Sequence, residues 1–160
     1  MNLYALKQKP EYLDQVAIWL YHEWGEKTEG SSLQVVKEKL KTFINIDTLP
    51  INFILLEEGN LVGTFNLMLS DPPTRKDLSP WFGSLYVEPN YRNQGIGTFL
   101  LKSAVSKAKE FGIQKLYLCT PTRQKMYTKS GWQPIDEVKF RGEKVTIMEI
   151  ITYRDRNGQH

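Results

Sequence analysis

Residues 84–98 have the sequence Ser84-Leu-Tyr-Val-Glu-Pro-Asn-Tyr-Arg-Asn-Gln-Gly-Ile-Gly-Thr98, and a helical pattern follows over residues 99–112. The apolar residues 85–87 predict a strand, and the Pro89-Asn90 turn ends it. The first amides of a helix have no intrahelical acceptor and carry partial positive charge from the peptide dipoles. A glycine-bearing loop that opens such a helix is typical of a phosphate-binding site.

The spacing of the glycines limits which phosphate ligand fits. Gly95 and Gly97 have no Cβ, so a diphosphate can approach the backbone closely and the loop can use positive φ. The stretch lacks the GxGxxG of a dinucleotide-binding fold and the Gly-Lys-Ser/Thr of a P-loop. A strand-to-helix loop without a ligand would have a similar composition, so the residues on either side carry the assignment.

Arg92-x-x-Gly95-x-Gly97 resembles the R/Q-x-x-G-x-G/A signature of the GNAT acyltransferases, and Tyr127-x-x-x-Gly131-Trp132 resembles a second motif of that family. The resemblance covers residues 51–151. It implies an α/β fold of the α+β type, with a central, mostly antiparallel sheet, one splayed parallel strand pair and about four flanking helices. It also implies a single domain over residues 1–153, followed by a polar tail at 154–160.

The patterns along the chain agree with that fold. Strands are predicted at residues 3–6, 51–56, 61–69, 115–119, 132–138 and 144–151, and the first helix begins at Pro10 and ends at Gly25. Ser31 and Gln34 predict a capping box for a second helix. Residues 70–80 hold three prolines and predict a long loop, either a binding loop or a solvated connection. A short helix is predicted at residues 123–129.

The resemblance implies that acetyl-CoA is the acyl donor and that its phosphates and pantetheine arm contact two groups of residues. The backbone of Leu85, Tyr86 and Val87 would run beside the pantetheine, with the Val87 amide near the thioester carbonyl. The pyrophosphate would be held by Arg92, Asn93, Gln94, Gly95, Ile96, Gly97 and Thr98. Thr120-Pro121-Thr122 departs from the Ala-rich helix start common in the family.

Tyr127 is the candidate general acid, because the resemblance places this tyrosine near the CoA sulfur. A packing role in the core is the alternative. A family base on the strand ending at Val87 has no counterpart here, since residues 80–84 contain no carboxylate. His22, Glu23, Asp71, Asp77 and an ordered water remain candidates. Without an obvious base, an α-amine, which needs about 1.4 kcal/mol to be neutral at pH 7, is favoured over a lysine-like amine, which needs about 4–5 kcal/mol.

Composition supports a cytoplasmic globular protein of one domain. The chain has 160 residues, 41% hydrophobic and 24% charged, with a net charge of +3. No apolar run is long enough to span a bilayer, and the N-terminal residues lack a signal-peptide core. Cys119, the single cysteine, is expected to be a buried structural thiol, and no Cys/His cluster indicates a metal. We expect neither nucleic acid nor membrane as a partner, and a monomer or homodimer.

The expected function is therefore transfer of the acetyl group of acetyl-CoA to a primary amine of a small molecule, peptide or protein N-terminus, by direct attack in a ternary complex. The alternative is a non-catalytic acyl-CoA-binding or regulatory module. Trp19, Tyr21, Trp24 and Trp81 are candidates for lining the acceptor side, although the helical stripe spacing favours a core position for Trp19. Neither the acceptor nor the preferred acyl length follows from the sequence.

Overall fold

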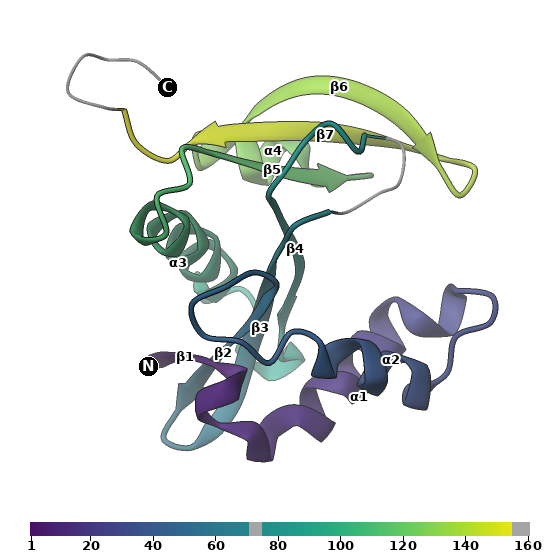
Figure 1. The fold of residues 1–160 in the computed structure, drawn as a ribbon, viewed down its shortest axis with the longest axis vertical. Coiled ribbons are helices and arrows are strands. Elements are labelled where there is room, and N and C mark those ends of the chain that lie inside the picture. Colours follow the sequence, from purple (N-terminus) through teal and green to yellow (C-terminus); the bar gives the residue numbers. More distant parts are fainter. Residues whose placement is uncertain (71–74, 155–160) are drawn as a thin grey trace. The chain divides into compact units, whose positions relative to one another are not determined.

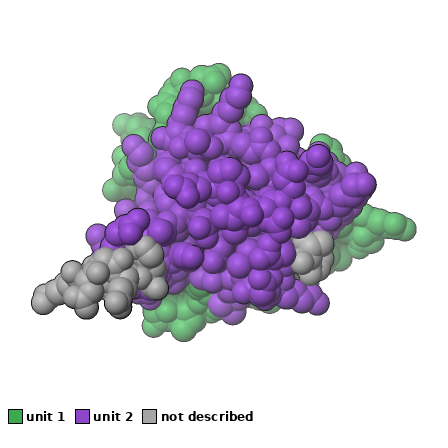
Figure 2. Space-filling view, turned by 90° about the horizontal axis from the view of Figure 1, so that it is seen from above, with its two compact units in different colours: residues 1–66, 84–100 green, residues 67–83, 101–160 purple. Residues whose placement is uncertain are grey.

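The computed structural model describes residues 1–70 and 75–154, which divide into two compact units. Residues 1–66 and 84–100 form the first unit, and the described residues of 67–83 and 101–160 form the second (Figure 2). Strands β3 and β4 and helix α3 run from one unit into the other. In the described residues, seven strands are ordered β1-β2-β3-β4-β5-β7-β6, and there are four α-helices (Figure 1). The predicted fold class is confirmed.

The first unit begins with strand β1, Asn2–Ala5, which pairs antiparallel with β2, Ile51–Glu57. Between them lie α1, Leu13–Glu23, and α2, Leu33–Lys41. Pro10 starts a 3-10 turn, Pro10–Tyr12, so the α-helix begins later than predicted. The predicted N-cap of α2, Ser31, is also wrong by one residue. The hydroxyl oxygen of Ser32 accepts the amide hydrogen of Val35 at 3.1 Å.

Strand β3, Asn60–Met68, follows β2 through a tight turn and carries the glycine that brings α3 close. A Cβ on Gly63 would lie 2.6 Å from Leu100 Cδ1 and 3.3 Å from the Tyr86 carbonyl oxygen. Glycine is therefore required here for close approach. The stacked rings of Phe53 and Phe65, with centroids 5.0 Å apart, complete the core of this unit.

Strand β4 extends over Trp81–Val87, four residues more toward the N-terminus than predicted. Trp81 and Phe82 are buried in the second unit, where Trp81 lies opposite Tyr117 of β5, Lys115–Thr120, in a parallel pair. Helix α3, Ile96–Glu110, connects these two strands, and the expected parallel strand pair is confirmed. Gly112, with φ +75°, ends the helix as expected.

The second unit is completed by α4, Gln124–Lys129, and by the hairpin of β6, Gln133–Phe140, and β7, Glu143–Ile151 (Figure 1). β7 pairs antiparallel with β5, from Lys115↔Ile151 to Thr120↔Thr146. A bulge between Pro134 and Asp136 interrupts β6. Arg75 links the loop before β4 to β6, because its guanidinium lies 2.5 Å from the carboxylate of Asp136. The same guanidinium lies 2.9 Å from the carboxylate of Asp77 within the loop.

Candidate functional site

The loop from β4 to α3 opens the helix with free backbone donors. Residues 89–91 form a 3-10 turn in which the Glu88 carboxylate accepts the Asn90 amide hydrogen at 2.8 Å. The Phe99 amide donates to the Gly95 carbonyl at 3.0 Å and begins the helical hydrogen bonding. The amides of Ile96, Gly97 and Thr98 precede it and have no acceptor within the helix. They form a donor set suited to a phosphate.

Gly95 and Gly97 are glycines for different reasons. Gly95 has φ +82°, a conformation that a side chain would strain. Gly97 lies inside α3, its φ is not positive, and a Cβ there would meet only Val87 Cγ2, at 4.0 Å. Neither backbone conformation nor packing within the chain requires glycine at position 97, although glycine costs a helix about 1 kcal/mol. The space above Gly97 is therefore available to a ligand, and of the two glycines only Gly95 uses positive φ.

Arg92 joins this loop to the end of β4. Its Nε–H donates to the Val87 carbonyl at 2.9 Å, and its guanidinium lies 5.2 Å from the centre of the Tyr86 ring. Tyr86 also packs on Trp19 of α1, with ring centroids 4.9 Å apart. The charged side chain is exposed but held in place, at the same end of the strand as the α3 amides.

Ser84 is a feature of the site that our sequence analysis missed. It has φ +54° within β4, a left-handed conformation that is uncommon for a residue other than glycine. Such a residue departs from the extended conformation of a regular strand. The residues that follow, 85–87, are half-buried, whereas residues 61–68 of β3 are all buried. The flanking Gly83-Ser84 pair was the available signal, because glycine inside a strand often marks a bulge.

Tyr127 lies in the second unit, on α4, and is 7% exposed. Its ring meets Trp132 edge-on, with centroids 6.2 Å apart, and the Trp132 amide donates to the Tyr127 carbonyl at 3.1 Å. Burial raises the pKa of Tyr127, the positive charge of Arg123 opposes the rise, and Cys119 adds to it. The phenol therefore keeps its proton through neutral pH, as a general acid must.

The ten predicted cofactor-binding residues all lie in the first unit, and the predicted acid lies in the second. Among the predicted bases, Asp77 is ion-paired with Arg75, which lowers the pKa of that carboxyl. His22 Nδ1 lies 2.6 Å from Glu26 Oε1 on the exposed end of α1. Glu23 is exposed, and Asp71 lies outside the described residues.

The aromatic residues predicted for the acceptor side separate into two groups. Trp19 and Tyr21 are half-buried and Trp24 is 43% exposed, all in the first unit. Trp81 is fully buried in the second unit, and its indole N–H donates to the Leu78 carbonyl at 2.7 Å. Trp81 is therefore a core residue. Cys119 is half-buried, so the expectation of full burial was wrong.

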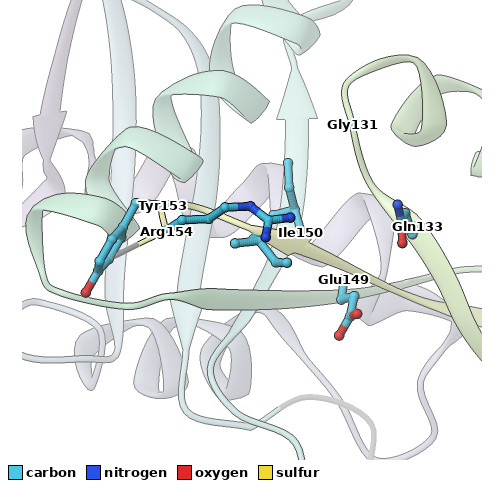
Figure 3. Close-up of a pocket in the computed structure, with 7 residues that line it drawn as sticks. Gly131, Gln133, Glu149, Ile150, Tyr153 and Arg154 are labelled. Atoms are coloured by element: carbon cyan, nitrogen blue, oxygen red, sulfur yellow. The ribbon is translucent and has the colours of Figure 1, made fainter. Parts of the chain in front are cut away.

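Two surface pockets of about 250 Å³ each lie in the second unit, and neither contains a predicted site residue. Figure 3 shows the first, where Gly131 and Gln133 face β7 residues Glu149 and Ile150, and Tyr153 and Arg154 follow that strand. In residues 1–70 and 75–154, no group of three or more His, Cys, Asp or Glu side chains is arranged to hold a metal. No helix in that part of the chain has the length and apolarity needed to cross a membrane.

Comparison with known proteins agrees with the geometry. The model of the acetyltransferase (GNAT) family matches residues 13–132. A probable spermine N(1)-acetyltransferase of Bacillus subtilis subsp. natto (strain BEST195) is 26% identical over 103 residues, which are 60% of this chain and 68% of that protein.

Two solved structures share the fold at low identity. An aminoglycoside 6'-N-acetyltransferase complexed with coenzyme A has a TM-score of 0.73 and 16% identity, covering 96% of this chain and 98% of that one. A ribosomal-protein-alanine N-acetyltransferase from Brucella melitensis has a TM-score of 0.70 and 18% identity, and the match covers 94% of this chain and 99% of that one. With three quarters of its length matched by the family model, this chain belongs to the acetyltransferase (GNAT) family of acetyl-CoA-dependent N-acetyltransferases.

Proposed function

We propose that this chain transfers the acetyl group of acetyl-CoA to a primary amine by direct attack of the amine on the bound thioester. The observation that carries the proposal is Gly97. A helical glycine that the folded chain does not need, next to unpaired amides and a fixed arginine, is explained by a phosphate that must approach the backbone. The cradle residues are Arg92, Asn93, Gln94, Gly95, Ile96, Gly97 and Thr98.

The end of β4 supplies the backbone for the reactive part of the donor. In this proposal Leu85, Tyr86 and Val87 align the pantetheine, and the Val87 amide donates to the thioester oxygen as negative charge develops on it. Preorganised donors at such an oxygen contribute about 3–4 kcal/mol in other acyl transfers. The left-handed Ser84 supports this role, because its φ of +54° departs from regular strand geometry just before these three residues.

Tyr127 is proposed to donate its phenolic proton to the sulfur as the carbon–sulfur bond breaks. The new carbon–nitrogen bond forms from the amine lone pair, and the amine nitrogen loses its proton. The raised pKa of Tyr127 supports the role, since the phenol stays protonated at the pH of reaction. Direct attack requires no acyl-enzyme, so replacement of Cys119 by alanine should not abolish turnover, and initial-rate plots should intersect rather than run parallel.

The proton on the incoming amine is proposed to pass to water. Asp77 is a poor base because its ion pair with Arg75 lowers the pKa of the carboxyl. His22 and Glu23 lie on the exposed end of α1. If water takes the proton, kcat/KM for the amine rises with pH until the pH passes the pKa of the amine itself. Acceptors of different pKa should shift the profile in parallel with that pKa.

Acceptors with several amines are the class that we propose. The similar proteins are named for spermine, spermidine and aminoglycosides. The end of α1 and the segment after it carry Glu23, Glu26 and Glu29 around the exposed Trp24, which suits additional ammonium groups on the acceptor. The α-amine of a peptide, which is easier to deprotonate, is the competing class.

An acceptor panel tests both the activity and the class. Free thiol release from acetyl-CoA is measured with spermine, spermidine, an aminoglycoside, a peptide that begins with alanine, and Nα-acetyl-lysine methyl ester. Each acceptor is present at the same concentration. We expect the highest kcat/KM with the polyamines or the aminoglycoside. Preference for the peptide would refute the proposed class but keep the activity. Tight CoA binding without thiol release from any acceptor would instead support the non-catalytic binding module.

The cellular setting follows from the donor. We propose that the protein acts in the cytoplasm, as a monomer or homodimer, with no nucleic-acid or membrane partner, since the reaction uses only acetyl-CoA and an amine. Light scattering of the purified protein measures the oligomeric state directly.

A further inference from the structure

The second pocket, with a volume of about 250 Å³, lies on the flank of α3 and has no part in the proposed acetyl transfer. One side is the helix from Leu101 to Ser106, and the other is formed by Ser130, Trp132 and Ile150. Leu101, Val105 and Ile150 make part of the surface apolar. The remaining lining residues are Lys102, Ser106, Ser130 and Trp132.

Trp132 provides an unusual polar group at this pocket. Its side chain is 1% exposed, and its indole N–H is buried without an acceptor among the described residues. An indole N–H can only donate, and a buried donor without an acceptor is costly. The neighbouring rings of Tyr127 and Phe82 pack against it at centroid distances of 6.2 Å. An acceptor entering from the pocket would remove this cost.

The other polar groups are also mainly donors. Lys102 and Ser106 are four residues apart and lie on one face of α3, and both are exposed. Lys102 makes no ion pair within residues 1–70 and 75–154, whereas Lys107 on the same helix contacts Glu110 at 3.2 Å. No carboxylate lines the pocket. An ammonium, two hydroxyls and an indole N–H around an apolar floor complement an anion with an apolar body.

We propose that this pocket binds a small monocarboxylate. The carboxylate accepts hydrogen bonds from the Trp132 indole and a serine hydroxyl and pairs with Lys102, while its apolar body contacts Leu101, Val105 and Ile150. A volume of about 250 Å³ is below the roughly 300–1,000 Å³ of sites for drug-sized ligands, so short-chain and aryl carboxylates such as butyrate and benzoate fit the class. Because the indole nitrogen is buried, lining side chains must shift to admit the acceptor atom.

The test uses the indole N–H resonances of the full chain labelled with ¹⁵N, which has four tryptophans. Saturating CoA is present throughout, so that carboxylates cannot report from the acyl-CoA site. Benzoate and butyrate are titrated, with benzamide as the uncharged match. We expect a saturable shift of the Trp132 indole resonance with the carboxylates. Benzamide should bind at least fivefold more weakly.

Lys102→Gln and Lys109→Gln form the matched pair of variants, since both lysines are exposed on α3 and only Lys102 lines the pocket. Lys102→Gln should weaken benzoate at least fivefold, and Lys109→Gln should not change it. The indole resonances are assigned by through-bond NMR correlations. The assignment therefore does not need a Trp132→Phe variant, which could fail to fold. An unmoved Trp132 indole, or equal loss in the two lysine variants, would overturn the proposal and leave a bound water as the partner of the indole.

Discussion

Replacement of Gly97 by alanine separates the demands of the fold from those of the ligand. A Cβ at this position has room, since its nearest neighbour would be Val87 Cγ2 at 4.0 Å, and the backbone is helical. Alanine is favoured over glycine in a helix interior by about 1 kcal/mol, which is an upper bound here because Gly97 is the second residue of α3. The variant should therefore be at least as stable as the wild type. For a chain of this size, the gain in Tm is at most about 2–4 °C.

The same methyl group should weaken cofactor binding. It occupies the space through which a pyrophosphate oxygen must approach the first-turn amides. The loss of one hydrogen bond to a charged group, about 1.5–3 kcal/mol, corresponds to a rise in Kd of about 10- to 150-fold. Calorimetric titration with CoA gives the affinity, and thermal unfolding without ligand gives the stability. Affinity should fall while stability does not.

Two further glycines serve as controls. Gly95→Ala places a side chain at φ +82°, so both stability and CoA affinity should fall. Gly59→Ala places one at φ +80° in the turn between β2 and β3, away from the cradle, so stability should fall while affinity is unchanged. If Gly97→Ala is folded and binds CoA as tightly as the wild type, the argument that position 97 is kept free for a phosphate is wrong.

Three other changes test the rest of the site. Tyr127→Phe should lower kcat by about 10- to 100-fold at nearly constant KM for acetyl-CoA. Because burial raises the pKa of Tyr127, the wild type should also lose stability as the pH rises above about 10. The variant should lose less, and urea unfolding at pH 9 and 11 measures the difference. Ser84→Gly should leave the protein equally or more stable and Ser84→Val should destabilise it, since the position has φ +54°; equal unfolding free energies for the two would contradict the strain. Arg92→Gln should raise the Kd for CoA up to about fivefold and reduce its salt dependence, whereas Lys109→Gln should do neither.

The order and type of the elements followed from the sequence because local patterns and packing agree there. The apolar stripe that predicted α3 consists of Leu101, Ala104, Ala108 and Phe111. The first three side chains are buried, and Phe111 is half-buried. The turn at residues 57–60 predicted the hairpin of β2 and β3. Gly112 marked the end of α3, where a left-handed residue without Cβ is needed. The glycine-bearing loop led to the cradle by the same local reasoning.

Features that depend on distant contacts were not predictable. The start of β4 was missed because Pro80 and the residues before it have the composition of a loop. Trp81 packs against Tyr117, which is far away in the chain. Ser32 caps α2 although Ser31 has the better capping-box spacing. The left-handed Ser84 was missed because Gly83 beside it, although it is the kind of residue that marks an irregular strand, does not say which residue takes the left-handed conformation. Arg92 was expected at the phosphate site, but its hydrogen bond to the Val87 carbonyl beside Tyr86 depends on tertiary geometry and was not predicted.

The most direct test of the proposed function is the stoichiometry of one reaction. Purified protein is incubated with acetyl-CoA and the best acceptor of the panel, and free thiol and N-acetylated amine are measured in the same samples over time. We predict that the two products form in equal amounts and only when the amine is present. Thiol released without N-acetylated product, or no release from any acceptor by a protein that binds CoA, would contradict direct acetyl transfer to an amine.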